Sequence, residues 1–146
     1  MNPLKTIYCN QYFELKQQGK EANARKNGTI LTTFALVLTL FAIYILWITF
    51  FPDAERTMNR FIRKTVGRTS GRMFGKIGAG VLMIISYVLV RYTIGTAKSY
   101  QNTINYFDKL SSWEQEKISK KGFKLFIFSI VLIAVSLASL LIKTYI

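Results

Sequence analysis

Few side chains in this sequence have catalytic potential, and they lie outside its apolar segments. The 146 residues include no histidine and a single cysteine, Cys9, which excludes a histidine base, a histidine metal site and a cysteine cluster. Two carboxylate pairs, Asp53 with Glu55 and Glu114 with Glu116, have a spacing of two residues that makes their side chains diverge on a helix. We therefore predict a protein that is not an enzyme, with no metal, no cofactor and no small-molecule substrate.

The apolar residues are concentrated in three blocks, and a helix needs about 20 such residues to cross a bilayer. The first and third blocks, residues 29–51 and 125–142, are long enough. The middle block has only 14 residues between Lys76 and Arg91, and it spans only if these cations extend to the lipid headgroups. We predict an all-α, polytopic integral membrane protein of one domain, residues 1–146, with three transmembrane helices at residues 29–51, 73–95 and 123–143. The alternative is two spans with an interfacial or re-entrant middle segment.

The N-terminal segment is predicted to form a short amphipathic helix over residues 3–18. Asn2 suits the N-cap and Pro3 the first turn. Apolar residues follow at helical spacing on one face. We expect this helix to lie on the membrane surface or against a partner protein.

The polar segment 96–122 is also predicted to be helical. Apolar residues at helical spacing, among them Ile104 and Phe107, indicate that the second span continues as a helix beyond the membrane. Ser111 and Glu114 form a capping-box pattern, which predicts a separate short helix over residues 113–121.

The most ordered stretch is the basic interfacial segment 52–72 and its continuation to residue 76. The stretch contains seven cations, and six of them recur at every fourth residue. We predict that all seven contact lipid headgroups or a partner: Arg56, Arg60, Arg63, Lys64, Arg68, Arg72 and Lys76. On one continuous helix each step of four advances by about 40°, which would carry the later cations onto the apolar face. We therefore predict an amphipathic helix near residues 53–66 in the interface plane, followed by a break at 67–71.

Small residues recur every three or four positions in each apolar block. Helices associate in lipid through close backbone approach and side-chain hydrogen bonds, and small residues permit both. The predicted packing seams are Thr32, Ala35, Thr39 and Ala42 in the first span, Gly75, Ala79 and Ser86 in the second, and Ser129, Ser136 and Ser139 in the third. These seams either pack on one another in a three-helix bundle or dock at least one helix on another subunit.

The formal net charge of +13 predicts anionic partners. Because the cations flank membrane spans, we expect anionic phospholipids and no nucleic acid.

The numbers of Lys and Arg on the two sides of the spans predict the orientation. There are five in the N-terminal segment and six in the loop between the second and third spans, against seven in the loop between the first two spans and Lys143 after the third. The positive-inside rule therefore favours the N-terminus inside by a small margin. Arg91 is either a snorkelling interface anchor or a functional charge within the membrane. The expected location is an inner or cytoplasmic membrane of the energy-transducing type.

These features predict a non-catalytic accessory or scaffolding subunit of a larger membrane complex, such as a respiratory, secretion, motor or transport assembly. Other membrane subunits are then its expected partners. A small oligomeric channel or transporter is the main alternative, although none of the seven acidic residues lies in an apolar block, where a cation pathway would place a carboxylate. A lipid-binding or membrane-remodelling protein is a further alternative.

Overall fold

The computed structural model describes residues 2–66 and 71–145, and these residues form helices and short connections, with no strand among them. The prediction of an all-helical chain is therefore confirmed. The elements are α1 (Pro3–Gln17), the 3₁₀ turn η1 (Glu21–Asn23), α2 (Ala24–Phe50), α3 (Pro52–Val66), α4 (Gly71–Thr93), α5 (Ala97–Asp108) and α6 (Ser112–Tyr145).

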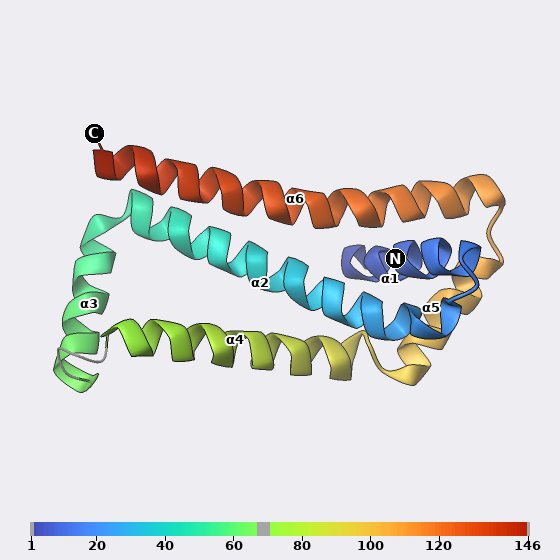
Figure 1. Cartoon of the computed structure of the whole chain (residues 1–146), viewed down its shortest axis with the longest axis horizontal. Helices are drawn as coiled ribbons and strands as arrows, with labels where there is room; N and C mark the ends of the chain where they lie inside the picture. The colour runs from blue at the N-terminus through green and yellow to red at the C-terminus, as the bar shows by residue number, and fades with distance from the viewer. Residues whose placement is uncertain (1, 67–70, 146) are drawn as a thin grey trace.

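Three long helices lie side by side in one row, with α2 between α6 and α4 (Figure 1). α2 and α6 run in the same direction. Thr39 of α2 donates a hydrogen bond to Ser129 of α6 at 3.2 Å, and further along both helices Lys143 donates to the Thr49 carbonyl oxygen at 2.7 Å. α4 runs in the opposite direction and returns the chain to the end where α2 begins. Among the described residues, no helix covers the outer sides of α4 and α6.

The most deeply buried apolar residues are concentrated at one end of the row, in a compact region that we call the cap. It consists of α1, η1, α5 and the adjoining ends of α2, α4 and α6. Its core includes Ile7, Tyr8, Cys9, Ala24, Val90, Ile104 and Phe107. α1, which we expected on the membrane surface or against a partner protein, packs against α2, α5 and α6 of its own chain.

Gly122 allows α1 and α6 to approach closely. A Cβ atom at this position would lie 2.5 Å from the carbonyl carbon of Thr6 and 3.0 Å from the Ile7 nitrogen. Asn10, one turn further along α1, donates a hydrogen bond to the Ser119 hydroxyl at 3.1 Å. The contact between these helices therefore combines close backbone approach with a buried polar bond.

The chain bends by 63° between α4 and α5, where the sequence predicted one continuous helix. Thr96 begins α5 as its N-cap, since its hydroxyl accepts a hydrogen bond from the Ser99 N–H at 3.2 Å. Gly95, just before it, packs against Tyr8. The helical spacing of apolar residues identified the helix but not the bend, because the same spacing continues on both sides of the N-cap residue Thr96.

α6 runs without a break from Ser112 to Tyr145, so the short helix predicted over residues 113–121 is the first part of the third long helix. The predicted capping box forms at its start. The Glu114 carboxylate accepts from the Ser111 N–H at 3.1 Å, and the Ser111 hydroxyl accepts from the Glu114 N–H at 3.4 Å. The apparent boundary at Gly122 is not a helix end but the position where α1 packs.

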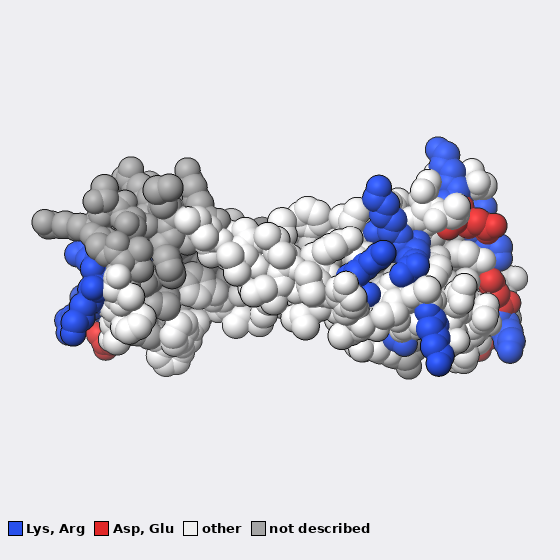
Figure 2. Space-filling view, turned by 90° about the horizontal axis from the view of Figure 1, so that it is seen from below, with Lys and Arg blue, Asp and Glu red and all other residues white. Residues whose placement is uncertain are grey.

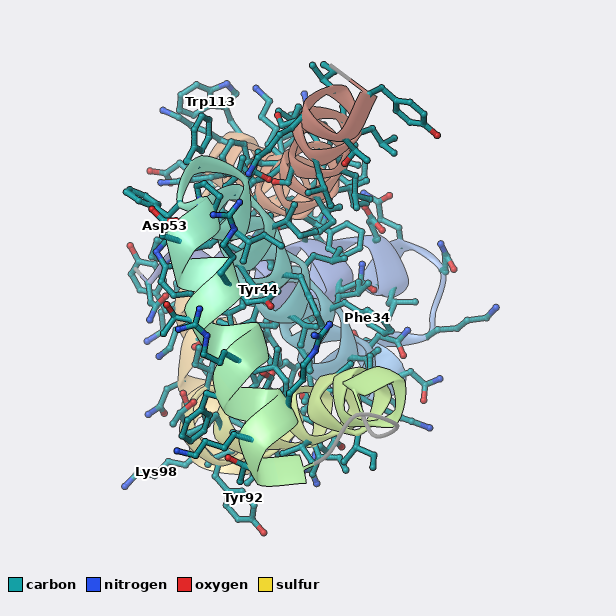
Figure 3. The ribbon with its side chains drawn as sticks, turned by 90° about the vertical axis from the view of Figure 1, so that its left-hand side faces the viewer. Phe34, Tyr44, Asp53, Tyr92, Lys98 and Trp113 are labelled. Carbon is teal, nitrogen blue, oxygen red and sulfur yellow. The ribbon has the colours of Figure 1, made fainter. Side chains whose placement is uncertain are left out.

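α3 crosses the end of the row opposite the cap and joins the end of α2 to the start of α4 (Figures 1 and 3). Its bounds agree with the helix predicted near residues 53–66. The predicted break at 67–71 falls mainly on residues 67–70, which lie outside the described residues. α4 begins at Gly71 and runs across the direction of α3.

Two segments, Glu21–Phe50 and Ser112–Tyr145, are long and apolar enough to cross a membrane. A third qualifies if the bent pair Ile77–Thr93 and Ala97–Asp108 is one span. On the face shown in Figure 2, no charged residue is visible in the described surface between the two ends of the molecule, and charges gather at the ends. These features are compatible with a membrane location.

Candidate functional site

Tyr8 lies at the centre of the cap and connects α1 with α2 and with the bend before α5. Its side chain is 1 % exposed, and its hydroxyl donates a hydrogen bond to Thr29 Oγ1 at 2.9 Å. A Cβ atom at Gly28 would lie 2.6 Å from the Tyr8 ring, and one at Gly95 would lie 2.9 Å from the Tyr8 hydroxyl. The two glycines thus leave room for the tyrosine ring.

The buried phenol and thiol of the cap are held in their protonated forms. Burial raises the pKa of Tyr8, although the Thr29 hydrogen bond and the positive charges of Arg25 and Arg91 act in the opposite direction. Burial also raises the pKa of Cys9 to about 12. Because the thiolate is the nucleophilic form, Cys9 is a packing residue at neutral pH.

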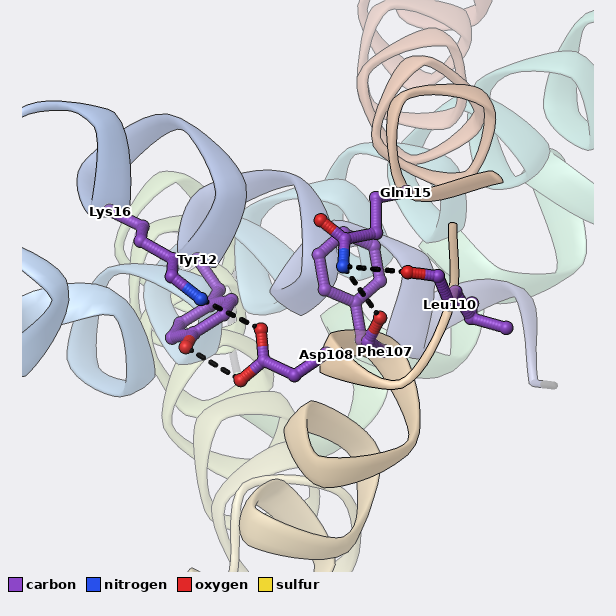
Figure 4. A network of polar contacts seen from close by, with 6 residues as sticks. All are labelled: Tyr12, Lys16, Phe107, Asp108, Leu110 and Gln115. Atoms are coloured by element: carbon purple, nitrogen blue, oxygen red, sulfur yellow. Dashed lines mark hydrogen bonds and ion pairs between the residues drawn. The ribbon is translucent and has the colours of Figure 1, made fainter. Parts of the chain in front are cut away.

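A polar network closes the cap between α1, α5 and α6 (Figure 4). Asp108 accepts a hydrogen bond from the Tyr12 hydroxyl at 2.9 Å and forms an ion pair with Lys16 at 2.9 Å. The Gln115 amide donates to the carbonyl oxygens of Phe107 and Leu110, each at 3.1 Å, and so satisfies acceptors at the end of α5. These contacts fix the positions of α1, α5 and the start of α6 relative to one another.

A cationic surface follows one face of α6 in the cap. It borders an open hollow of about 600 Å³ lined by Trp113, Glu116, Lys117, Lys120, Lys121 and Lys124. The Lys117 ammonium lies 4.9 Å from the centre of the Trp113 ring, and Lys120 pairs with Glu116 at 2.6 Å. From the sequence, these lysines were predicted only as charges of the loop before the third span. Their shared face depends on α6 being continuous, and their spacing of three and four residues is the signal that could have identified it.

The seven cations predicted to contact headgroups or a partner are only partly described. Arg56, Arg60, Arg63 and Lys64 lie on α3 and are exposed. Arg56 lies 3.8 Å from Asp53, and both side chains are highly exposed, so this ion pair adds little stability. Arg68 lies outside the described residues, as do the side chains of Arg72 and Lys76.

Most residues of the predicted packing seams are covered within the chain. The buried members are Thr32, Ala35, Ala42, Ser86, Ser129 and Ser136, and the half-buried ones are Thr39, Ala79 and Ser139. The burial of Gly75 is not among the described features. The Thr39–Ser129 hydrogen bond joins the seam of α2 to that of α6. The α2 and α6 seams thus meet each other in the row.

Arg91 is exposed in the last turn of α4, where the helix meets the cap. Its charge acts on Tyr8 together with that of Arg25, whose Nε donates a hydrogen bond to the Gly95 carbonyl oxygen at 3.0 Å. The junction of α2, α4 and the cap is therefore cationic.

Among the described residues, no group of three or more His, Cys, Asp or Glu side chains is placed to hold a metal ion. The sequence matches no protein-family model, and neither the curated proteins nor the solved structures give a significant match. The candidate sites are therefore the cationic surfaces at the two ends of the molecule and the apolar faces between them.

Proposed function

We propose that this chain is a non-catalytic accessory subunit of a larger integral membrane complex. The observation that carries the proposal is the arrangement of the long helices in a row. Among the described helices, α2 is covered on both sides, whereas α4 and α6 are covered on one side only. Of the α4 side chains described, only Ser86 and Val90 are buried. A spanning helix attached along so narrow a strip gains packing from a neighbouring subunit.

The shared direction of α2 and α6 supports a third crossing by α4. If α2 and α6 both cross the bilayer, the chain has to return between them, and α4 is the long helix in that interval. Its 23 residues, at about 1.5 Å each, give about 34 Å, enough for a hydrocarbon core of about 30 Å. The length of α4 and its return direction favour three spans over a re-entrant middle segment.

α3 then lies at the membrane surface, across the end of the row. Its exposed cations Arg56, Arg60 and Lys64 suit contact with anionic headgroups. The lysines of α6 lie at the opposite end and suit the other surface. Cationic residues at both ends would hold the three helices at a fixed depth.

The proposed docking surface is the face of α4 turned away from α2. Its members lie opposite Ser86 and Val90 on the helix and are between 45 and 76 % exposed: Ile77, Val81, Ile85, Val88 and Tyr92. Because α6 and α4 lie on opposite sides of α2, the described helices enclose no path along their axes. The row therefore favours a subunit over a pore formed by one chain.

Photocrosslinking in the native membrane tests this function. A benzoylphenylalanine at Val88 is expected to give one discrete protein adduct, and purification in mild detergent a complex of fixed stoichiometry. Lys98, exposed in the cap, is the matched control position and is expected to give no adduct. Purification as a monomer, with no protein adduct from Val88, would refute the proposal.

A further inference from the structure

An apolar groove lies between α2 and α4, in the half of the row nearer the cap. It has a volume of about 370 Å³, and its walls include Ile30, Phe34 and Val37 of α2 and Met83, Ile84 and Tyr87 of α4. Phe34 and Tyr87 are 44 % and 43 % exposed, so the groove is open to the surroundings. Its size is within the range of small-molecule sites.

Each of the two helices carries a cation four residues from the groove. Lys26 precedes Ile30 on α2, and Arg91 follows Tyr87 on α4. Four residues advance by about 40° and about 6 Å, so each cation lies on the face that lines the groove, one turn nearer the cap. Because the two helices run in opposite directions, both cations lie at the same end of the groove. Both side chains are exposed.

We propose that this groove holds an acyl chain of one anionic phospholipid, with its phosphate between Lys26 and Arg91. The groove matches such a lipid in charge and polarity. Its two cations lie at one end of an apolar surface, just as the anionic headgroup of a phospholipid lies at one end of its apolar acyl chains. The inference rests on the proposed third crossing by α4, which puts the groove at membrane depth. It does not rest on the subunit function.

A helix of another protein suits the groove less well than a lipid chain. Close helix packing in membranes uses small residues at the contact, whereas this groove is lined by large side chains. Thr33 is the one small residue among those that line it, and it is buried. Met83 and the aromatic rings conform more readily to a flexible acyl chain than to a helix backbone.

The test uses the purified full-length protein in lipid nanodiscs. Phosphatidylglycerol with a photoactivatable group in its acyl chain is compared with phosphatidylcholine that carries the same group. Peptides containing Phe34 or Tyr87 are expected to be labelled preferentially by phosphatidylglycerol. Each of Lys26→Gln and Arg91→Gln is expected to lower this labelling about five-fold, and the double variant about 25-fold, since a cation near an anionic surface contributes about this factor.

Lys98→Gln with Lys109→Gln is the matched control, because it removes two exposed cations of the cap that lie off the groove faces. It is expected to change labelling less than two-fold. Equal labelling by the two lipids, or equal losses in both double variants, would overturn the inference. So would a protein adduct from benzoylphenylalanine at Phe34 in native membranes. Lipid selectivity in a protein that purifies as a monomer and gives no Val88 adduct would refute the subunit function alone. A Val88 adduct without lipid selectivity would refute the lipid site alone.

Discussion

Replacing Gly122 with alanine tests how the cap is held together. The added Cβ atom would lie 2.5 Å from the carbonyl carbon of Thr6 and 3.0 Å from the nitrogen of Ile7. Carbon atoms in ordinary contact are about 3.5–4.0 Å apart, so α1 has to move away from α6 by about 1 Å or more. Because the atoms in the way belong to the backbone, no side-chain rotation relieves the clash.

The expected cost follows from two opposing contributions. Forcing an extra methyl group into a packed core costs about 1–3 kcal/mol, and a clash with backbone belongs at the upper end of that range. Alanine in place of glycine inside a helix recovers about 1 kcal/mol. The net loss is about 2 kcal/mol in the free energy that holds α1 against α6, which corresponds to roughly 30-fold more frequent separation of the two helices.

Cys9 supplies the assay, because it lies on α1 and is 0 % exposed. Reaction of its thiol with excess maleimide in native buffer requires the cap to open. The Gly122→Ala protein is expected to react about 30-fold faster than the parent and to unfold at a temperature lower by about 4–8 °C in detergent. The label and the melting temperature thus report the same loss by independent routes.

Gly78→Ala is the matched control. Gly78 is also inside a long helix, and a Cβ atom there would meet nothing within 4 Å. The control protein is expected to react no faster than the parent. An unchanged labelling rate of Cys9 in Gly122→Ala, or an equal acceleration in Gly78→Ala, would contradict close packing of α1 on α6 at Gly122.

Two further predictions concern the same region. Tyr8→Phe keeps the ring but removes the 2.9 Å hydrogen bond to Thr29, and it is expected to lower the free energy of unfolding by about 1 kcal/mol in chemical denaturation. The second prediction is a loss of stability at high pH. Because folding raises the pKa of Cys9 from 9.0 to about 12, the folded state favours the protonated thiol, and this stability is complete below pH 9 and lost as the pH rises towards 12. The expected loss from Cys9 at pH 10 is about 1.4 kcal/mol, measured as the difference in unfolding free energy between pH 8 and 10. Cys9→Ala is expected to reduce the difference, and an unchanged pH dependence in that variant would contradict the assignment.

The local structure of this chain could be predicted from its sequence because the signals are local. Asn2 accepts a hydrogen bond from the Leu4 N–H at 3.0 Å as an N-cap, and Ser111 and Glu114 form their capping box. The three apolar blocks are also local signals, and each one marks one of the long helices. The position of α1 could not be predicted, because its apolar face would fit a membrane, a partner protein or its own chain equally well.

The candidate sites depend on contacts between residues far apart in the sequence. Nothing near Gly28 or Gly95 in the sequence indicates that both make room for Tyr8, since the ring comes from another helix. The groove between α2 and α4 depends on how each helix is rotated about its own axis. The pattern of small residues in the predicted seams did not determine that rotation. The predicted seam residue Ser86 is buried, whereas Tyr87 beside it lines the groove.

The cap explains how a chain can position three long helices without closing them around a core. Tyr8, Gly122 and the network at Asp108 hold the ends of α2, α4 and α6 together at one end of the row. At the other end, Lys143 donates hydrogen bonds to the last carbonyl oxygens of α2, which aligns α6 with α2 there. Between these ends α2 and α6 bury their seam residues against each other, among them Ala42 and Ser136, whereas the faces turned outward are exposed. Their apolar faces therefore stay available along the middle of the row, where we place the docking surface and the lipid groove.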